Sequence, residues 1–89
     1  MAVRRRIVVR GRVQGVFFRD TTRRRAESLG VAGWAANRGD GAVEVVAEGE
    51  PGAVEQLVAF LREGPRRAEV DDIEVSEEEP EGLAGFDIR

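Results

Sequence analysis

The 89-residue chain contains no Cys, His, Tyr or Lys, so all 14 of its basic residues are arginines. These absences exclude a Ser-His-Asp or Cys-His nucleophile pair, a Schiff base to lysine, a disulfide framework and a zinc site built from the usual Cys and His ligands. The net charge of −3 is unevenly distributed, because residues 1–25 carry +8 and residues 69–89 carry −8. Either the two segments neutralise each other in the fold, or the basic segment holds an anion site.

The first part of the chain predicts a strand, a loop and a helix. Apolar alternation predicts a strand over Arg4–Arg10, and residues 11–15 form a loop bounded by two glycines. Residues of one helical face follow at steps of four, four and three, namely Phe18, Thr22, Ala26 and Leu29. Gly30 ends this helix, and Asp20 or Thr21 is its expected N-cap.

The middle of the chain predicts a hairpin. The second strand is expected at Val31–Ala36, around Trp34, and the Asp40–Gly41 dipeptide is typical of a tight turn. The third strand is expected at Ala42–Glu48. Its strict alternation divides the side chains between an inward face, Val43, Val45 and Ala47, and an outward face, Glu44 and Glu48.

The last part of the chain predicts a helix and two strands. Pro51 suits the first turn of a helix that ends at Gly64, and its apolar face comprises Val54, Leu57, Val58 and Leu61. A fourth strand is expected at Val70–Val75. The acidic segment 77–82 predicts irregular structure, and Phe86 and Ile88 predict a short final strand.

This β-α-β-β-α-β order predicts one α+β domain over residues 1–89. The expected architecture is the ferredoxin-like split βαβ fold, an antiparallel sheet with two helices on one face. The fold hosts many unrelated functions and therefore identifies none by itself. No apolar run approaches the ~20 residues of a membrane span or the h-region of a signal peptide, so we expect a cytoplasmic protein and no membrane partner.

The segment Gly11–Arg19 has the features of an anion site. A glycine-rich turn into a helix leaves several backbone N–H groups unpaired, and Gly15 allows a ligand to approach the backbone closely. Arg19 lies in the first helical turn, from which its guanidinium can point back toward the same anion. Asn37, the only Asn, ends the second strand, where it is either a turn residue or a functional amide beside this loop.

Two motifs resemble one known family. The run Gly11-Arg12-Val13-Gln14-Gly15-Val16-Phe17-Phe18-Arg19 resembles the phosphate-binding signature of the acylphosphatases, G-R-V-Q-G-V-x-F-R. The run Gly33-Trp34-Ala35-Ala36-Asn37 resembles their second motif, G-W-V-x-N. The resemblance extends from Val3 to Arg89, and Phe17 stands at the variable position of the first motif. Arg38 departs from the uncharged residue that many relatives carry after the Asn.

The resemblance implies hydrolysis of acyl phosphates to a carboxylate and inorganic phosphate, without a cofactor, metal or covalent intermediate. Arg19 and Asn37 would be catalytic: Arg19 would bind the phosphoryl group, and Asn37 would hold the attacking water. The substrate-binding loop would comprise Gln14, Gly15, Val16, Phe17 and Phe18 together with Arg19. We expect a monomer whose partners are the small-molecule substrate and its phosphate product.

Two other functions remain open. A non-catalytic acylphosphatase-like module that binds phosphate or carbamoyl phosphate would share the same motifs. Such a domain opens the large hydrogenase-maturation proteins, but this chain lacks their cysteine-rich regions, which favours a stand-alone enzyme. An RNA-binding βαββαβ domain would present aromatic side chains on its central strands. The first and third predicted strands contain none, so we expect no nucleic-acid partner.

Overall fold

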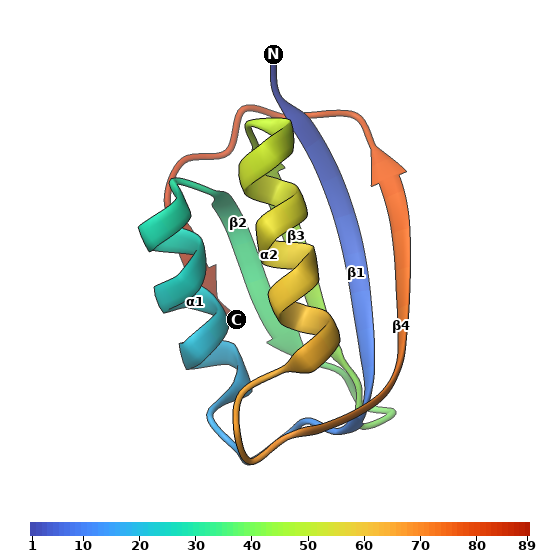
Figure 1. The fold of residues 1–89 in the computed structure, drawn as a ribbon. Helices are drawn as coiled ribbons and strands as arrows, with labels where there is room; N and C mark the ends of the chain where they lie inside the picture. Colours follow the sequence, from blue (N-terminus) through green and yellow to red (C-terminus); the bar gives the residue numbers. More distant parts are fainter.

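The computed structural model describes residues 1–89 as a five-stranded sheet covered on one face by two helices (Figure 1). The elements follow one another as β1 (Val3–Arg12), α1 (Phe18–Leu29), β2 (Ala32–Asn37), β3 (Val43–Gly49), α2 (Pro51–Glu63), β4 (Glu69–Glu78) and β5 (Phe86–Ile88). The expected α+β, ferredoxin-like order is thereby confirmed. Neither helix is long and apolar enough to cross a membrane.

The sheet has the strand order β4-β1-β3-β2-β5 and is mixed. Its four longer strands pair antiparallel, as expected. The expectation of a wholly antiparallel sheet is wrong, because β5 adds to the β2 edge in parallel, with Gly33 opposite Phe86 and Ala35 opposite Ile88. The chain must cross from β4 at one edge to β5 at the other, and this crossing reverses the direction of the last strand (Figure 1).

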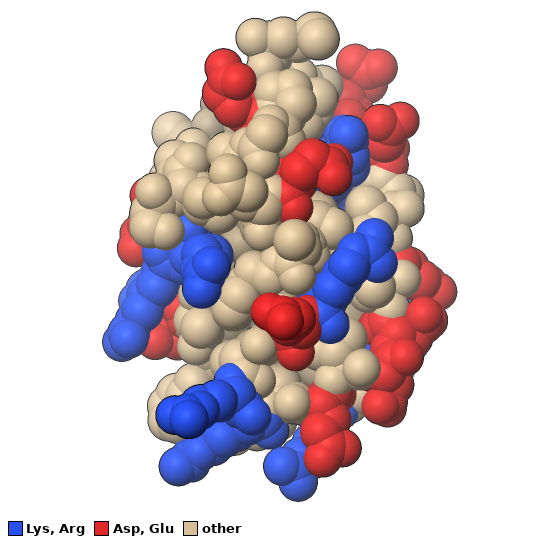
Figure 2. All heavy atoms as spheres, viewed as in Figure 1, with Lys and Arg blue, Asp and Glu red and all other residues tan.

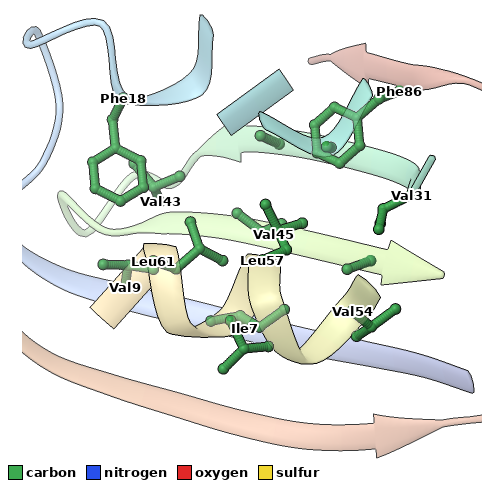
Figure 3. Close-up of a cluster of buried hydrophobic side chains, with 14 of the residues drawn as sticks. Ile7, Val9, Phe18, Val31, Val43, Val45, Val54, Leu57, Leu61 and Phe86 are labelled. Carbon is green, nitrogen blue, oxygen red and sulfur yellow. The ribbon is translucent and has the colours of Figure 1, made fainter. Parts of the chain in front are cut away.

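The hydrophobic core lies between the sheet and the two helices (Figure 3). The inward-facing residues of β1 and β3 include Ile7, Val9, Val43 and Val45, all without solvent exposure. Phe18 contributes the largest fully buried side chain at the start of α1. The predicted apolar face of α2 is confirmed, since its four residues are buried, namely Val54, Leu57, Val58 and Leu61.

Two local expectations are wrong. The N-cap of α1 is Phe17, in the left-handed region with φ 59°, and no side chain caps the helix. Asp20 instead lies in the first turn, where its carboxylate pairs with Arg23 and Arg24 at 3.1 and 3.2 Å. The acidic segment also begins as regular structure, since β4 continues through Glu78, whose carboxylate is paired with arginines of β1.

The face of the sheet opposite the helices carries an ion-pair network. Arg4 is only 6% exposed, so this arginine is buried within the network. Its guanidinium pairs with Glu78 at 2.8 Å and Glu48 at 3.4 Å. Glu48 points away from the core as expected but is 4% exposed, because the segment 81–83 covers it and donates three backbone N–H groups to its carboxylate.

The same open face argues against the RNA-binding alternative. In strand register, Arg6 lies opposite Val46, and Val46 lies opposite Trp34. The central strands β1 and β3 therefore present charged and aliphatic side chains on this face, and its one aromatic residue, Trp34, belongs to β2. The Trp34 ring is already in contact with two guanidinium groups, of Arg6 at 5.6 Å and Arg89 at 4.6 Å from its centroid.

Candidate active site

A pocket of about 270 Å³ lies where the loop after β1 meets the ends of β2 and β5. It brings together residues that are far apart in the sequence, namely Val13, Gly15, Phe17, Phe18, Arg19, Asp20, Asn37 and Ile88. The β1–α1 loop and the β2–β3 hairpin lie at the same end of the sheet in Figure 1. The pocket therefore combines the two sequence motifs in one place.

The loop offers a row of free backbone donors. The N–H groups of residues 14–20 donate to no carbonyl or carboxylate of the protein. Two residues of this stretch, Gly15 at φ 75° and Phe17 at φ 59°, have left-handed backbones. Such alternation of backbone handedness turns successive N–H groups toward one side, as in anion-binding nests, and the dipole of α1 adds positive potential. The loop can therefore hold an anion without any further side chain.

Arg19 adds the one side-chain cation among the residues that line the pocket. Its Nη1 donates to the main-chain oxygen of Arg89 at 3.0 Å, just after β5. The Arg89 N–H in turn donates to the carbonyl of Ala35 in β2 at 2.8 Å. The main-chain oxygen that follows β5 thus orients the guanidinium of Arg19. The remaining N–H groups of the guanidinium stay available to a ligand.

Gln14 fixes the loop to the hairpin that carries Asn37. Its Nε2 donates to the carbonyl oxygens of Arg38 and Ala42 at 2.8 and 2.9 Å. Asn37 itself is the exposed last residue of β2 and lines the pocket. The Gln14 side chain therefore does not reach into the pocket, but it sets the distance between the loop and the Asn37 amide.

The charges beside the pocket are largely paired. Arg38, the departure from the family pattern, does not line the pocket, and its Nη2 contacts the Asp40 carboxylate at 3.3 Å. The Ala42 N–H, followed by Arg10 and Arg38, lowers the pKa of Asp40 below its ordinary value. The Asp40 carboxylate thus offsets the positive charge that Arg38 adds near the site.

Most of the predicted site residues meet in the pocket, namely Gly15, Phe17, Phe18, Arg19 and Asn37. Gln14 and Val16 do not line it, so only their backbone N–H groups can take part. Reasoning from the sequence missed Ile88 and the main-chain oxygen of Arg89. Both belong to the β5 edge, and nothing in the local sequence indicates that this strand pairs with β2 beside the loop.

Comparison with known proteins gives a family match over most of the chain. Residues 5–88 match the acylphosphatase family. An acylphosphatase of Rubrobacter xylanophilus is 59% identical over 85 residues, which cover 94% of this chain and 77% of that protein. An acylphosphatase of Haloarcula marismortui is 52% identical over 86 residues, which cover 97% of this chain and 94% of that protein.

A solved structure has the same fold. The crystal structure of acylphosphatase from Bacillus subtilis superposes with a TM-score of 0.94 at 41% sequence identity, and the match covers 100% of this chain and 99% of the other. The family match, the close relatives and the superposition agree with the two motifs in the pocket. The chain belongs to the acylphosphatase family and is an acylphosphatase, an enzyme that hydrolyses acyl phosphates.

Proposed function

We propose that this pocket hydrolyses the carboxyl–phosphate bond by direct attack of water on phosphorus, with no covalent intermediate and no metal. The phosphoryl group would lie in the nest of free N–H groups at residues 14–20, and the guanidinium of Arg19 would bind two of its oxygens. The amide of Asn37 would orient the attacking water. The observation that carries the proposal is the convergence of the nest, Arg19 and Asn37 on one pocket.

The chemistry needs no more than these groups. The leaving group is a weakly basic carboxylate, so it departs without a general acid. Phosphoryl transfer passes through a loose transition state with charge on three equatorial oxygens, and catalysis then depends on positioning and charge stabilisation. A non-bridging phosphoryl oxygen accepts the proton of the attacking water, which fits a chain without histidine.

Asn37→Ala tests the water-orienting role. Loss of one preorganised group at a charged transition state lowers kcat by about 10²–10³-fold, and we expect a loss of that size. Phosphate release from acetyl phosphate and benzoyl phosphate is the measurement. Gln56→Ala, which removes an exposed amide from α2, is the matched control and should retain wild-type turnover.

The outcomes distinguish the alternatives. Full turnover by Asn37→Ala would remove the proposed role of this amide. Hydrolysis in ¹⁸O-labelled water should place the label in phosphate, whereas label in the carboxylate would mean attack at carbon. Phosphoprotein trapped by acid quenching would reveal a covalent intermediate. A wild-type protein that binds phosphate but turns over no acyl phosphate would be the non-catalytic module.

A further inference from the structure

Phe17 places a large apolar side chain in solvent at the rim of the pocket. The residue is 75% exposed, whereas its neighbour Phe18 is fully buried in the core. The other exposed large apolar residues, Met1 and Val75, do not line the pocket. Phe17 is therefore the one largely exposed apolar side chain among the residues that line the pocket.

The backbone of Phe17 makes this placement costly. Phe17 is the only non-glycine residue with a positive φ, and glycine adopts this conformation far more readily. The free N–H groups of the loop would form equally well with glycine at this position. Because strained residues persist at sites where their side chain serves a purpose, the phenyl ring itself requires an explanation.

The rest of the pocket shows which ligand group the ring could meet. Arg19 and the backbone N–H groups form the polar part, and the Asp20 carboxylate is paired with arginines of its own helix. The remaining lining includes Val13, which is fully buried, and Ile88 of β5, which is half-buried. Beyond the anion nest, the pocket therefore offers an apolar surface formed by Phe17 and Ile88.

We propose that Phe17, together with Ile88, forms an acyl-binding surface that selects acyl phosphates with apolar, preferably aromatic, acyl groups. This inference rests on the proposed function, because it assigns the phosphoryl group to the nest and Arg19. With the phosphorus held there, the acyl group projects toward the pocket rim. An aromatic acyl group can stack on the exposed ring and remove apolar surface of both from water.

Two substrates with the same reacting bond test the proposal. We expect wild-type protein to have a higher kcat/KM for benzoyl phosphate than for acetyl phosphate. Phe17→Gly removes the ring and suits the left-handed backbone, and it should reduce the benzoyl-to-acetyl ratio of kcat/KM by about 3- to 10-fold. Phe17→Tyr keeps the ring and should hold that ratio within about twofold.

A control outside the site and a second readout sharpen the result. Val75→Ala removes an exposed apolar side chain from β4 and should leave both kcat/KM values unchanged. Competitive inhibition by inorganic phosphate reports on the nest and Arg19, without any contribution from an acyl group. An unchanged ratio in Phe17→Gly, or an equal loss for both substrates, would overturn the proposal. A wild-type protein inactive on both substrates would instead contradict the proposed function.

Discussion

At the scale of single residues, the site depends on how one arginine is held. Arg19 uses one N–H group to reach the main-chain oxygen of Arg89 and leaves the others for a ligand. The planar guanidinium suits this division, because its donors are fixed in direction and can bind two oxygens of a phosphoryl group at once. Lysine has the same charge but no such fixed pair of donors.

Arg19→Lys should therefore be nearly as damaging as loss of the charge. We expect kcat/KM for acetyl phosphate to fall by about 10²–10³-fold, because the paired donors to the transition state are lost. The inhibition constant for inorganic phosphate should rise in parallel. Arg25→Lys, on the exposed face of the same helix, is the control and should behave as wild type. Phosphate inhibition that is equal in Arg19→Lys and wild type would contradict this role for Arg19.

The match to two family motifs selects Arg19 and Asn37 as candidate site residues, and the structure places both at one pocket. The two residues are found from the spacing of the two motifs and from the predicted order of helices and strands. The contribution of the Arg89 main-chain oxygen could not be predicted, because its contact with Arg19 joins residues 70 positions apart. The left-handed backbone of Phe17 also escaped prediction, since only glycine signals this conformation in a sequence.

At the scale of elements, a glycine allows two strands to approach closely. Gly33 lies in β2 with φ 145°, opposite Ala47 of β3. A Cβ added at Gly33 would overlap the main-chain carbonyl of Val46, which cannot move without breaking the β2–β3 pairing. β2 also carries Asn37 and binds β5, so this glycine supports the frame of the site.

Gly33→Ala should destabilise the protein strongly. We expect the free energy of unfolding to fall by about 3 kcal/mol or more, because both the backbone conformation and the strand contact become unfavourable. Urea unfolding followed by circular dichroism gives the value. Gly39→Ala, in the adjoining hairpin where a Cβ meets nothing within 4 Å, should change stability by less than about 0.5 kcal/mol. Equal stabilities of the two variants would refute this explanation.

The order and type of the helices and strands could be predicted from the sequence. The end of β4 and the pairing of the edge strand β5 could not. β4 extends to Glu78 because arginines of β1 pair with the carboxylate of Glu78. The strand propensity of a residue takes no account of such cross-strand ion pairs, so it does not predict this extension. The parallel addition of β5 depends on the path of residues 79–85 across the sheet. Both features arise from contacts between segments that are distant in the chain.

At the scale of the whole molecule, the two charged ends of the sequence become neighbours. β1 and β4 pair antiparallel, and the arginines of residues 4–6 lie opposite Glu78, Glu77 and Ser76. On the helix side, acidic side chains gather along the β4 edge and arginines over α1 (Figure 2). The polarity therefore serves mainly to join the sheet, and only Arg19 of the basic segment lines the pocket.

Glu48 links this network to the crossing segment. The N–H groups of residues 81–83 and the guanidinium of Arg4 lower the pKa of Glu48, against the opposing effect of burial. A carboxyl whose folded-state pKa is depressed stabilises the fold above its ordinary pKa of 4.5 and loses this contribution as pH falls through the folded-state value. Glu48 thus makes the attachment of the segment leading to β5 sensitive to acid.

Glu48→Gln should remove this contribution. Because hydrogen bonds to a buried charged group are lost, we expect the free energy of unfolding to fall by about 2–3 kcal/mol near pH 7. The difference from wild type should shrink as pH falls below the ordinary pKa of 4.5, and it should be lost below the depressed folded-state pKa, where the native carboxyl is also protonated. Glu79→Gln removes an exposed carboxylate just after β4 and is the control, which should keep wild-type stability. A difference that stays constant with pH would rule out this charge as its source.

The position of Trp34 makes the protein its own optical probe. With no tyrosine in the chain, ultraviolet emission comes almost entirely from this one indole. The ring contacts the guanidinium of Arg89. The main-chain oxygen of the same Arg89 accepts a hydrogen bond from Arg19 at the pocket. An anion that draws Arg19 inward alters this chain of contacts, so quenching or a wavelength shift of the Trp34 fluorescence can follow ligand binding without any attached label.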